Sequence, residues 1–129
     1  MNYPENLKYT KDHEYVRLEG NKAYVGITFY AQDQLGDVVF VELPELGTEV
    51  KQGEVLATVE SVKAVSDVYA PVSGTIVEIN EELNDSPEIV NNDPYGEGWI
   101  CAIELSNLSE VDALMGHEEY RKLVEEGGD

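Results

Sequence analysis

The chain has little positive charge and almost no cysteine. Among its 129 residues, 8 are Lys or Arg and 27 are Asp or Glu, which gives a formal net charge of −19 at pH 7. Such a surface repels nucleic-acid phosphates and anionic membrane faces, which argues against both kinds of partner. The acidity fits transient docking onto basic protein surfaces, or simply solubility. The one cysteine, Cys101, excludes an internal disulfide and a Cys-x-x-Cys redox or zinc motif.

Long apolar runs and targeting signals are also missing. No apolar stretch approaches the length of a membrane span. Residues 1–5 show neither the basic nor the apolar region of a signal peptide. We therefore expect a cytoplasmic protein, although a mature mitochondrial matrix protein would show the same features. The length predicts one domain, residues 1–129.

Most of the chain shows short β-type runs separated by turn residues. Strands are predicted at 15–18, 22–27, 38–43, 54–61, 64–69, 75–80 and 99–105. A short helix is predicted over 29–35 and a longer one over 109–126, where Ser109 and Asp112 resemble a capping box. Residues 84–93 are predicted to form a polar loop, and Gly53 and Gly74 to be turn glycines with positive φ. The pattern predicts a mainly β protein with a helix in each half.

Lys63 is isolated from other positive charges. Between Lys51 and Arg121 it is the one Lys or Arg, while residues 52–120 carry fifteen Asp or Glu. A single lysine in a long acidic stretch indicates a specific use, and an ordinary surface lysine is the alternative. An accessible amine is a nucleophile that can form an amide with a prosthetic group.

Residues 53–74 resemble a lipoyl-attachment hairpin, in which Glu60-Ser61-Val62-Lys63-Ala64 stands between two strands. From about Tyr9 to Val124 the chain resembles the glycine cleavage system H protein family. The matching stretches are 9–16, 25–28, 31–32, 34–37, 38–44 and 92–99. One departure is Tyr15, where the family usually has Trp. The resemblance implies a barrel-sandwich hybrid of the lipoyl/biotinyl-carrier type, with Lys63 at the hairpin tip.

The resemblance also implies a covalent carrier rather than an enzyme. Lipoate would be joined by an amide to Lys63 by a lipoate ligase or a lipoyl/octanoyl transferase. Glycine decarboxylase, a pyridoxal-phosphate enzyme, would load an aminomethyl group onto this arm. A tetrahydrofolate-dependent aminomethyltransferase would unload it, and dihydrolipoamide dehydrogenase would reoxidise the dithiol. A shuttle that visits several enzymes is expected to be a monomer.

The candidates for a role beside Lys63 are five further residues: Glu60, Ala64, Asp67, His13 and Glu14. Glu60 and Asp67 either help a lipoylating enzyme to recognise the hairpin or are solvated strand charges. Ala64 is small, which leaves access to the attachment point. The run Asp12-His13-Glu14 either shelters the charged aminomethyl arm between visits, or is a polar surface loop with a satisfied histidine.

Other carriers share parts of this pattern. A biotin carrier typically has Met on both sides of its lysine, where this chain has Val62 and Ala64. A lipoyl domain of a 2-oxoacid dehydrogenase commonly has Asp before the lysine and lacks segments like 12–14 and 92–99. A lipoyl donor in lipoate relay and a purely structural acidic domain stay open as alternatives. No nucleophile–histidine pairing and no metal-ligand spacing is visible, so an enzyme is not expected.

Overall fold

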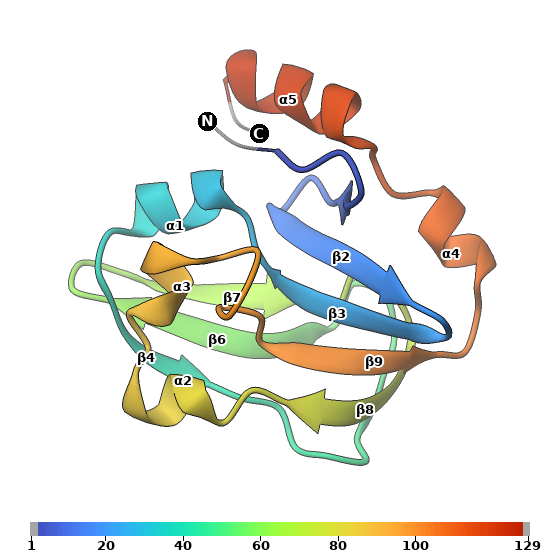
Figure 1. Ribbon diagram of the computed structural model, residues 1–129, viewed down its shortest axis with the longest axis horizontal. Helices are drawn as coiled ribbons and strands as arrows, with labels where there is room; N and C mark the ends of the chain where they lie inside the picture. Colours follow the sequence, from blue (N-terminus) through green and yellow to red (C-terminus); the bar gives the residue numbers. More distant parts are fainter. Residues whose placement is uncertain (1–2, 128–129) are drawn as a thin grey trace.

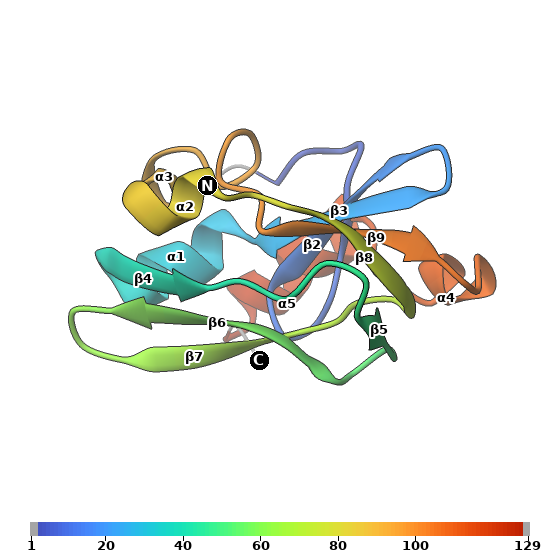
Figure 2. The ribbon, with the colours of Figure 1, turned by 90° about the horizontal axis from the view of Figure 1, so that it is seen from below.

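Two antiparallel sheets form the body of the protein (Figures 1 and 2). The computed structural model describes residues 3–127, so positions 1–2 and 128–129 of the predicted domain lie outside the described residues. The larger sheet has the order β1 (Lys8–Tyr9), β2 (Glu14–Glu19), β3 (Lys22–Ile27), β9 (Cys101–Leu105), β8 (Gly74–Ile79) and β5 (Glu49–Val50). The smaller sheet has the order β4 (Val38–Glu42), β6 (Val55–Ser61) and β7 (Val65–Tyr69).

The main hydrophobic core lies between the two sheets. Val25 and Ile103 from the larger sheet and Val41, Val59 and Val68 from the smaller one are almost completely buried. The strands predicted at 15–18 and 22–27 are confirmed as β2 and β3, which pair as an antiparallel hairpin. Gly20 at the turn adopts a positive φ of 64°. The predicted mainly β fold is therefore confirmed.

A β-bulge changes the face pattern of β6. The register with β7 shifts between Val55 and Ala57, so Leu56 and Ala57 are both buried while Val55 is 53% exposed. Simple alternation through β6 would have put Val55 and Ala57 on one face. Bulges bend a strand and strengthen its twist.

The two glycines predicted to form turns differ in the structure. Gly53 has a φ of 92°, which confirms its prediction. The turn predicted at Gly74 is wrong: Gly74 is the first residue of strand β8, where a Cβ would lie 1.9 Å from the carbonyl oxygen of Glu104 on β9. Close approach of the neighbouring strand therefore restricts position 74 to glycine as strongly as its φ of 158° does.

The predicted loop at 84–93 is wrong in part. It contains the second half of α2 (Glu82–Asp85) and all of α3 (Ile89–Asn92), two single-turn helices. Each is anchored by one fully buried side chain, Leu83 and Val90 respectively. Tertiary packing of these two apolar residues stabilises helical turns that the polar composition does not favour on its own.

The predicted continuous helix at 109–126 is also wrong. The segment forms α4 (Ser109–Asp112) and α5 (His117–Glu125), separated at 113–116. The helix breaks because the backbone of Met115 exchanges two hydrogen bonds with Tyr9 of β1, at 2.8 and 2.9 Å. The predicted capping box is not formed, since the side chain of Ser109 bonds Asn107 instead.

The helix α5 covers the end of the larger sheet (Figure 1). Its Tyr120 is fully buried and stacks on Tyr9, with ring centroids 4.6 Å apart and planes inclined by 7°. Together with Leu7 and Tyr15 these residues form a second hydrophobic cluster. None of the helices within residues 3–127 has the length and apolar character needed to cross a membrane.

Candidate functional site

Lys63 lies in the exposed turn between β6 and β7, as the resemblance predicted, although no Asn-Gly or Asp-Gly pair is present. Ser61 provides the turn chemistry instead. Its hydroxyl oxygen accepts hydrogen bonds from the backbone N–H groups of Lys63 and Ala64 at 3.3 and 3.1 Å. The backbone of Ser61 also donates to the carbonyl of Ala64 at 2.8 Å. This is a serine turn, in which the side chain replaces a second backbone partner.

The turn is fastened to the segment that follows α1 (Phe29–Leu35). The backbone N–H of Val62 donates to the carbonyl of Asp37 at 3.0 Å. The stem of Lys63 runs past Gly36, where an added Cβ would meet Lys63 Cε at 3.5 Å. Behind this contact, the amide of Asn91 donates to the carbonyl of Gly36 at 2.9 Å. These contacts hold the backbone of the turn in place, and the side chain of Lys63 is exposed.

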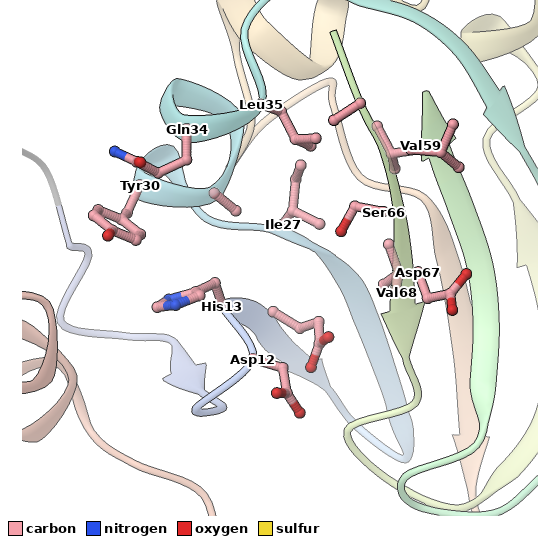
Figure 3. Close-up of a pocket in the computed structure, with 14 residues that line it drawn as sticks. Asp12, His13, Ile27, Tyr30, Gln34, Leu35, Val59, Ser66, Asp67 and Val68 are labelled. Carbon is pink, nitrogen blue, oxygen red and sulfur yellow. The ribbon is translucent and has the colours of Figure 1, made fainter. Parts of the chain in front are cut away.

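A cavity of about 410 Å³ opens beside the turn, between α1 and the outer edge of β7 (Figure 3). We call it the α1–β7 cavity. Its lining comes from the loop 12–14, from Ile27 and Val59, from α1 (Tyr30, Ala31, Gln34 and Leu35) and from residues 64–68. Because β7 is the last strand of its sheet, its outer backbone groups have no neighbouring strand.

Glu14 is a buried carboxyl in the wall of this cavity. It is 2% exposed. It accepts hydrogen bonds from the Thr10 hydroxyl at 2.6 Å and from the backbone N–H of Tyr69 on β7 at 3.0 Å. Burial raises the pKa of Glu14 from its ordinary value of 4.5 to about 7, although both hydrogen bonds act to lower it. A positive charge placed near this carboxyl would favour its ionised form.

His13 stands next to Glu14 with an unusual backbone. Its φ is 70°, the one positive value outside glycine among residues 3–127. Its Nδ1 lies 2.8 Å from the hydroxyl of Tyr120, and its ring packs against Tyr30 of α1 at 4.8 Å. The histidine is therefore satisfied, as one of the two interpretations expected. The neighbouring Glu14, however, is a buried cavity residue and not part of a polar surface loop.

The other sequence candidates divide into two groups. Ala64 and Asp67 line the α1–β7 cavity together with His13 and Glu14. Glu60 is exposed on β6, between Phe40 on one side and Val65 on the other, and does not line the cavity. The fold thus places four of the five candidates around one hollow beside Lys63.

Sequence reasoning missed two residues that matter here. Ser61 could have been identified by its position two and three residues before the N–H groups that it binds. The second is Tyr120, because no local signal shows that its hydroxyl reaches His13, 107 positions away in the sequence.

Cys101 is not part of the site. It lies buried in β9, and burial raises the pKa of its thiol to about 12. The segment 96–98 forms a turn, in which the carbonyl of Asp93 accepts from the N–H groups of Gly96 and Gly98 at 3.2 and 2.9 Å.

Comparison with known proteins identifies the family. The model of the glycine cleavage H-protein family matches residues 7–127. The glycine cleavage system H protein of Coprothermobacter proteolyticus is 61% identical over 127 residues, which is 98% of this chain and 100% of that one. The corresponding protein of Bacillus subtilis is 52% identical over 126 residues, 98% of this chain and 99% of that one.

A solved structure agrees with these relatives. The crystal structure of a glycine cleavage system H protein from Mycobacterium marinum superposes with a TM-score of 0.87 at 41% sequence identity. The match covers 95% of this chain and 98% of that chain. The likeness extends over both sheets and therefore agrees with the barrel-sandwich fold that the resemblance implied. This chain belongs to the glycine cleavage system H protein family.

Proposed function

We propose that this chain is the lipoylated carrier of the glycine cleavage system, with lipoate joined by an amide to Lys63. The observation that carries the proposal is the position of Lys63: it is exposed, on a braced turn, beside a hollow of about 410 Å³. The residues fit the group, since an exposed amine can be acylated and the mixed polar and apolar lining of the cavity suits an arm with an apolar chain. When bound, lipoate supplies a dithiolane whose sulfur holds the aminomethyl cargo.

The braced turn has a mechanical consequence for transfer. Ser61 and the Val62–Asp37 hydrogen bond hold the backbone of the tip, so the lysine stem is the moving part. A tether on a fixed base gives the carried sulfur a high effective concentration at each docked enzyme. Docking can therefore be weak, which suits a carrier that visits several enzymes in turn.

Glu14 and Asp67 are proposed to receive the cargo amine between visits. The amine is cationic when protonated, and both acidic residues belong to the lining of the α1–β7 cavity. An ammonium beside the buried Glu14 favours its ionised form, so the cation and the carboxylate stabilise each other. Residues of α1 and β7 line the cavity and would limit the access of water to the cargo. Glu14 is the stronger of the two candidates because its carboxyl is held in place by Thr10 and Tyr69.

The surface around Lys63 is proposed as the docking face for the partner enzymes. Four apolar side chains surround the tip and are exposed by 48 to 69%: Val39, Phe40, Val62 and Val65. Glu60 lies between Phe40 and Val65 in the pairing register, so acidic and apolar groups alternate there. Such a face fits an apolar socket with a basic rim. The proposed partners are glycine decarboxylase, the aminomethyltransferase, dihydrolipoamide dehydrogenase and the lipoate-attaching enzyme. We propose that the last of these recognises Glu60. The proposed location of these encounters is the cytoplasm.

Intact-mass analysis with peptide mapping tests the attachment site. After co-expression with lipoate ligase and lipoate, wild type is expected to gain one lipoyl group on the peptide that contains Lys63, and Lys63→Arg none. Lys51→Arg, another exposed lysine, is the matched control and should be modified like wild type. Lipoylation of Lys63→Arg, or biotin on Lys63, would overturn the proposal.

Loss of the loaded cargo tests the role of Glu14. We expect Glu14→Ala to release the aminomethyl group faster than wild type, because the cation loses its buried partner. Glu42→Ala, an exposed strand glutamate outside the cavity, is the control. Equal release rates for all three proteins would mean that the cavity gives no protection.

Exchange of labelled bicarbonate into glycine with purified decarboxylase then tests the glycine cleavage role against lipoate relay.

A further inference from the structure

One phenol hydroxyl joins three segments of the chain that are far apart in sequence. The oxygen of Tyr120 on α5 lies 2.8 Å from Nδ1 of His13 and 2.7 Å from Oγ1 of Thr28. A phenol donates one hydrogen bond and accepts others, so it can serve both groups at once. Burial raises the pKa of Tyr120, so the hydroxyl keeps its proton at physiological pH.

Both segments that Tyr120 contacts belong to walls of the α1–β7 cavity. Thr28 is the N-cap of α1, and its Oγ1 accepts from the backbone N–H of Ala31 at 3.2 Å. Thr28 therefore sets where the helical wall begins. His13 lies in the adjoining wall, directly before Glu14, and its ring packs against Tyr30 of α1. Tyr120 itself does not line the cavity, so its effect on a bound group is indirect.

The backbone of His13 depends on outside contacts. A positive φ is unfavourable for a residue with a side chain and persists when the surroundings hold it. The carbonyl of His13 accepts a hydrogen bond from the backbone N–H of Thr28 at 3.0 Å. The backbone N–H of His13 donates to the carbonyl of Thr10 at 3.1 Å. The bond to Tyr120 is the side-chain member of this set, and it orients the imidazole toward α1.

The phenol oxygen is held in place by aromatic packing. Tyr120 stacks on Tyr9, and the edge of Tyr3 meets its ring at a centroid distance of 5.4 Å. Its ring is fully buried, so it cannot swing away without opening the second hydrophobic cluster.

From this arrangement we propose that Tyr120 is a positioning residue for the cargo shelter. Through its hydroxyl, the C-terminal helix fixes the distance between the His13–Glu14 wall and the start of α1, and so sets how well the α1–β7 cavity retains the cationic cargo. The inference rests on the proposed function of that cavity. It assigns to α5 a role beyond covering the sheet.

The sharpest test compares Tyr120→Phe with Tyr9→Phe. Each change removes one buried phenol oxygen from the same aromatic stack, but the Tyr9 hydroxyl donates to the carbonyl of Pro4 and not to a cavity wall. We expect Tyr120→Phe to lose the loaded aminomethyl group about fivefold faster than wild type, the factor that corresponds to one net hydrogen bond. Tyr9→Phe is expected to lose it at the wild-type rate.

A second readout needs no lipoate. In the unmodified protein, ¹⁵N chemical shifts of the His13 imidazole report the hydrogen-bond state of Nδ1. Tyr120→Phe is expected to shift the Nδ1 signal, and Tyr9→Phe to leave it unchanged. Because both variants keep their rings, loss of folding would be visible as dispersion lost throughout the spectrum.

The two arms separate failure of the inference from failure of the proposed function. If Glu14→Ala accelerates cargo loss but Tyr120→Phe matches Tyr9→Phe, the positioning role is wrong and the shelter stands. If Glu14→Ala leaves the loss rate unchanged, the shelter is wrong and the inference falls with it. An unchanged His13 signal in Tyr120→Phe would also overturn the inference.

Discussion

The buried carboxyl of Glu14 is expected to make this protein less stable as the pH rises toward neutrality. Burial raises its pKa from 4.5 to about 7 in the folded state, whereas the unfolded chain exposes it to water. Below pH 4.5 the group is protonated in both states and costs nothing. Between the two values the unfolded state loses its proton first, so the free energy of unfolding falls with pH and levels off above the folded-state value.

The magnitude follows from the same two values. One pKa unit corresponds to about 1.4 kcal/mol, so a rise from 4.5 to about 7 corresponds to a loss of about 3 kcal/mol above neutrality. Other carboxyl groups also titrate, and a variant is therefore needed to isolate this one. In Glu14→Gln the amide oxygen can still accept from Tyr69, and the side chain is neutral at every pH.

The assay is urea unfolding followed by circular dichroism at several pH values from 4 to 8. At pH 4, Glu14→Gln and wild type are expected to have similar free energies of unfolding. At pH 7.5 and above, the variant should be more stable by about 3 kcal/mol. Glu42→Gln, at an exposed position on β4, serves as the control for removing a carboxyl. A stability difference between Glu14→Gln and wild type that does not change with pH would refute the reasoning.

Two further predictions concern the sheet interior. Gly74→Ala places a Cβ 1.9 Å from the Glu104 carbonyl oxygen, so thermal or urea unfolding is expected to show a loss of at least about 2 kcal/mol. Gly116→Ala, where a Cβ meets nothing within 4 Å, is the control, and equal losses for the two would contradict the steric argument. Cys101, buried and with its thiol pKa raised to about 12, is expected to resist iodoacetamide at pH 8 and to react in urea. Rapid labelling of the native protein would show that β9 opens readily.

Local sequence chemistry was enough to predict those elements that residues near in sequence stabilise. The helix at 29–35 was predicted with the bounds that the structure has, because Gly36 ends it with a φ of 82°. The hairpin of β2 and β3 likewise carries its turn residues between its strands. Lys63 could be singled out because charge isolation is visible in a linear sequence.

Elements that depend on distant partners were predicted less well. The break at 113–116 follows from the pairing of Met115 with Tyr9, which no pattern near either residue reveals. The short helices α2 and α3 form because the side chains of Leu83 and Val90 pack into the core. In both places tertiary contacts outweigh local propensity, which is a weak determinant in short segments.

The sequence by itself determined the family, the mainly β architecture and the lysine that we propose is modified. It also drew attention to Asp12-His13-Glu14, without deciding between a shelter and a surface loop. Only the tertiary structure decided that Glu14 is buried against the edge of β7 and that its pKa is raised, because desolvation depends on what covers a group. The link from Tyr120 to His13 likewise exists only in the folded chain, since it joins residues 107 positions apart.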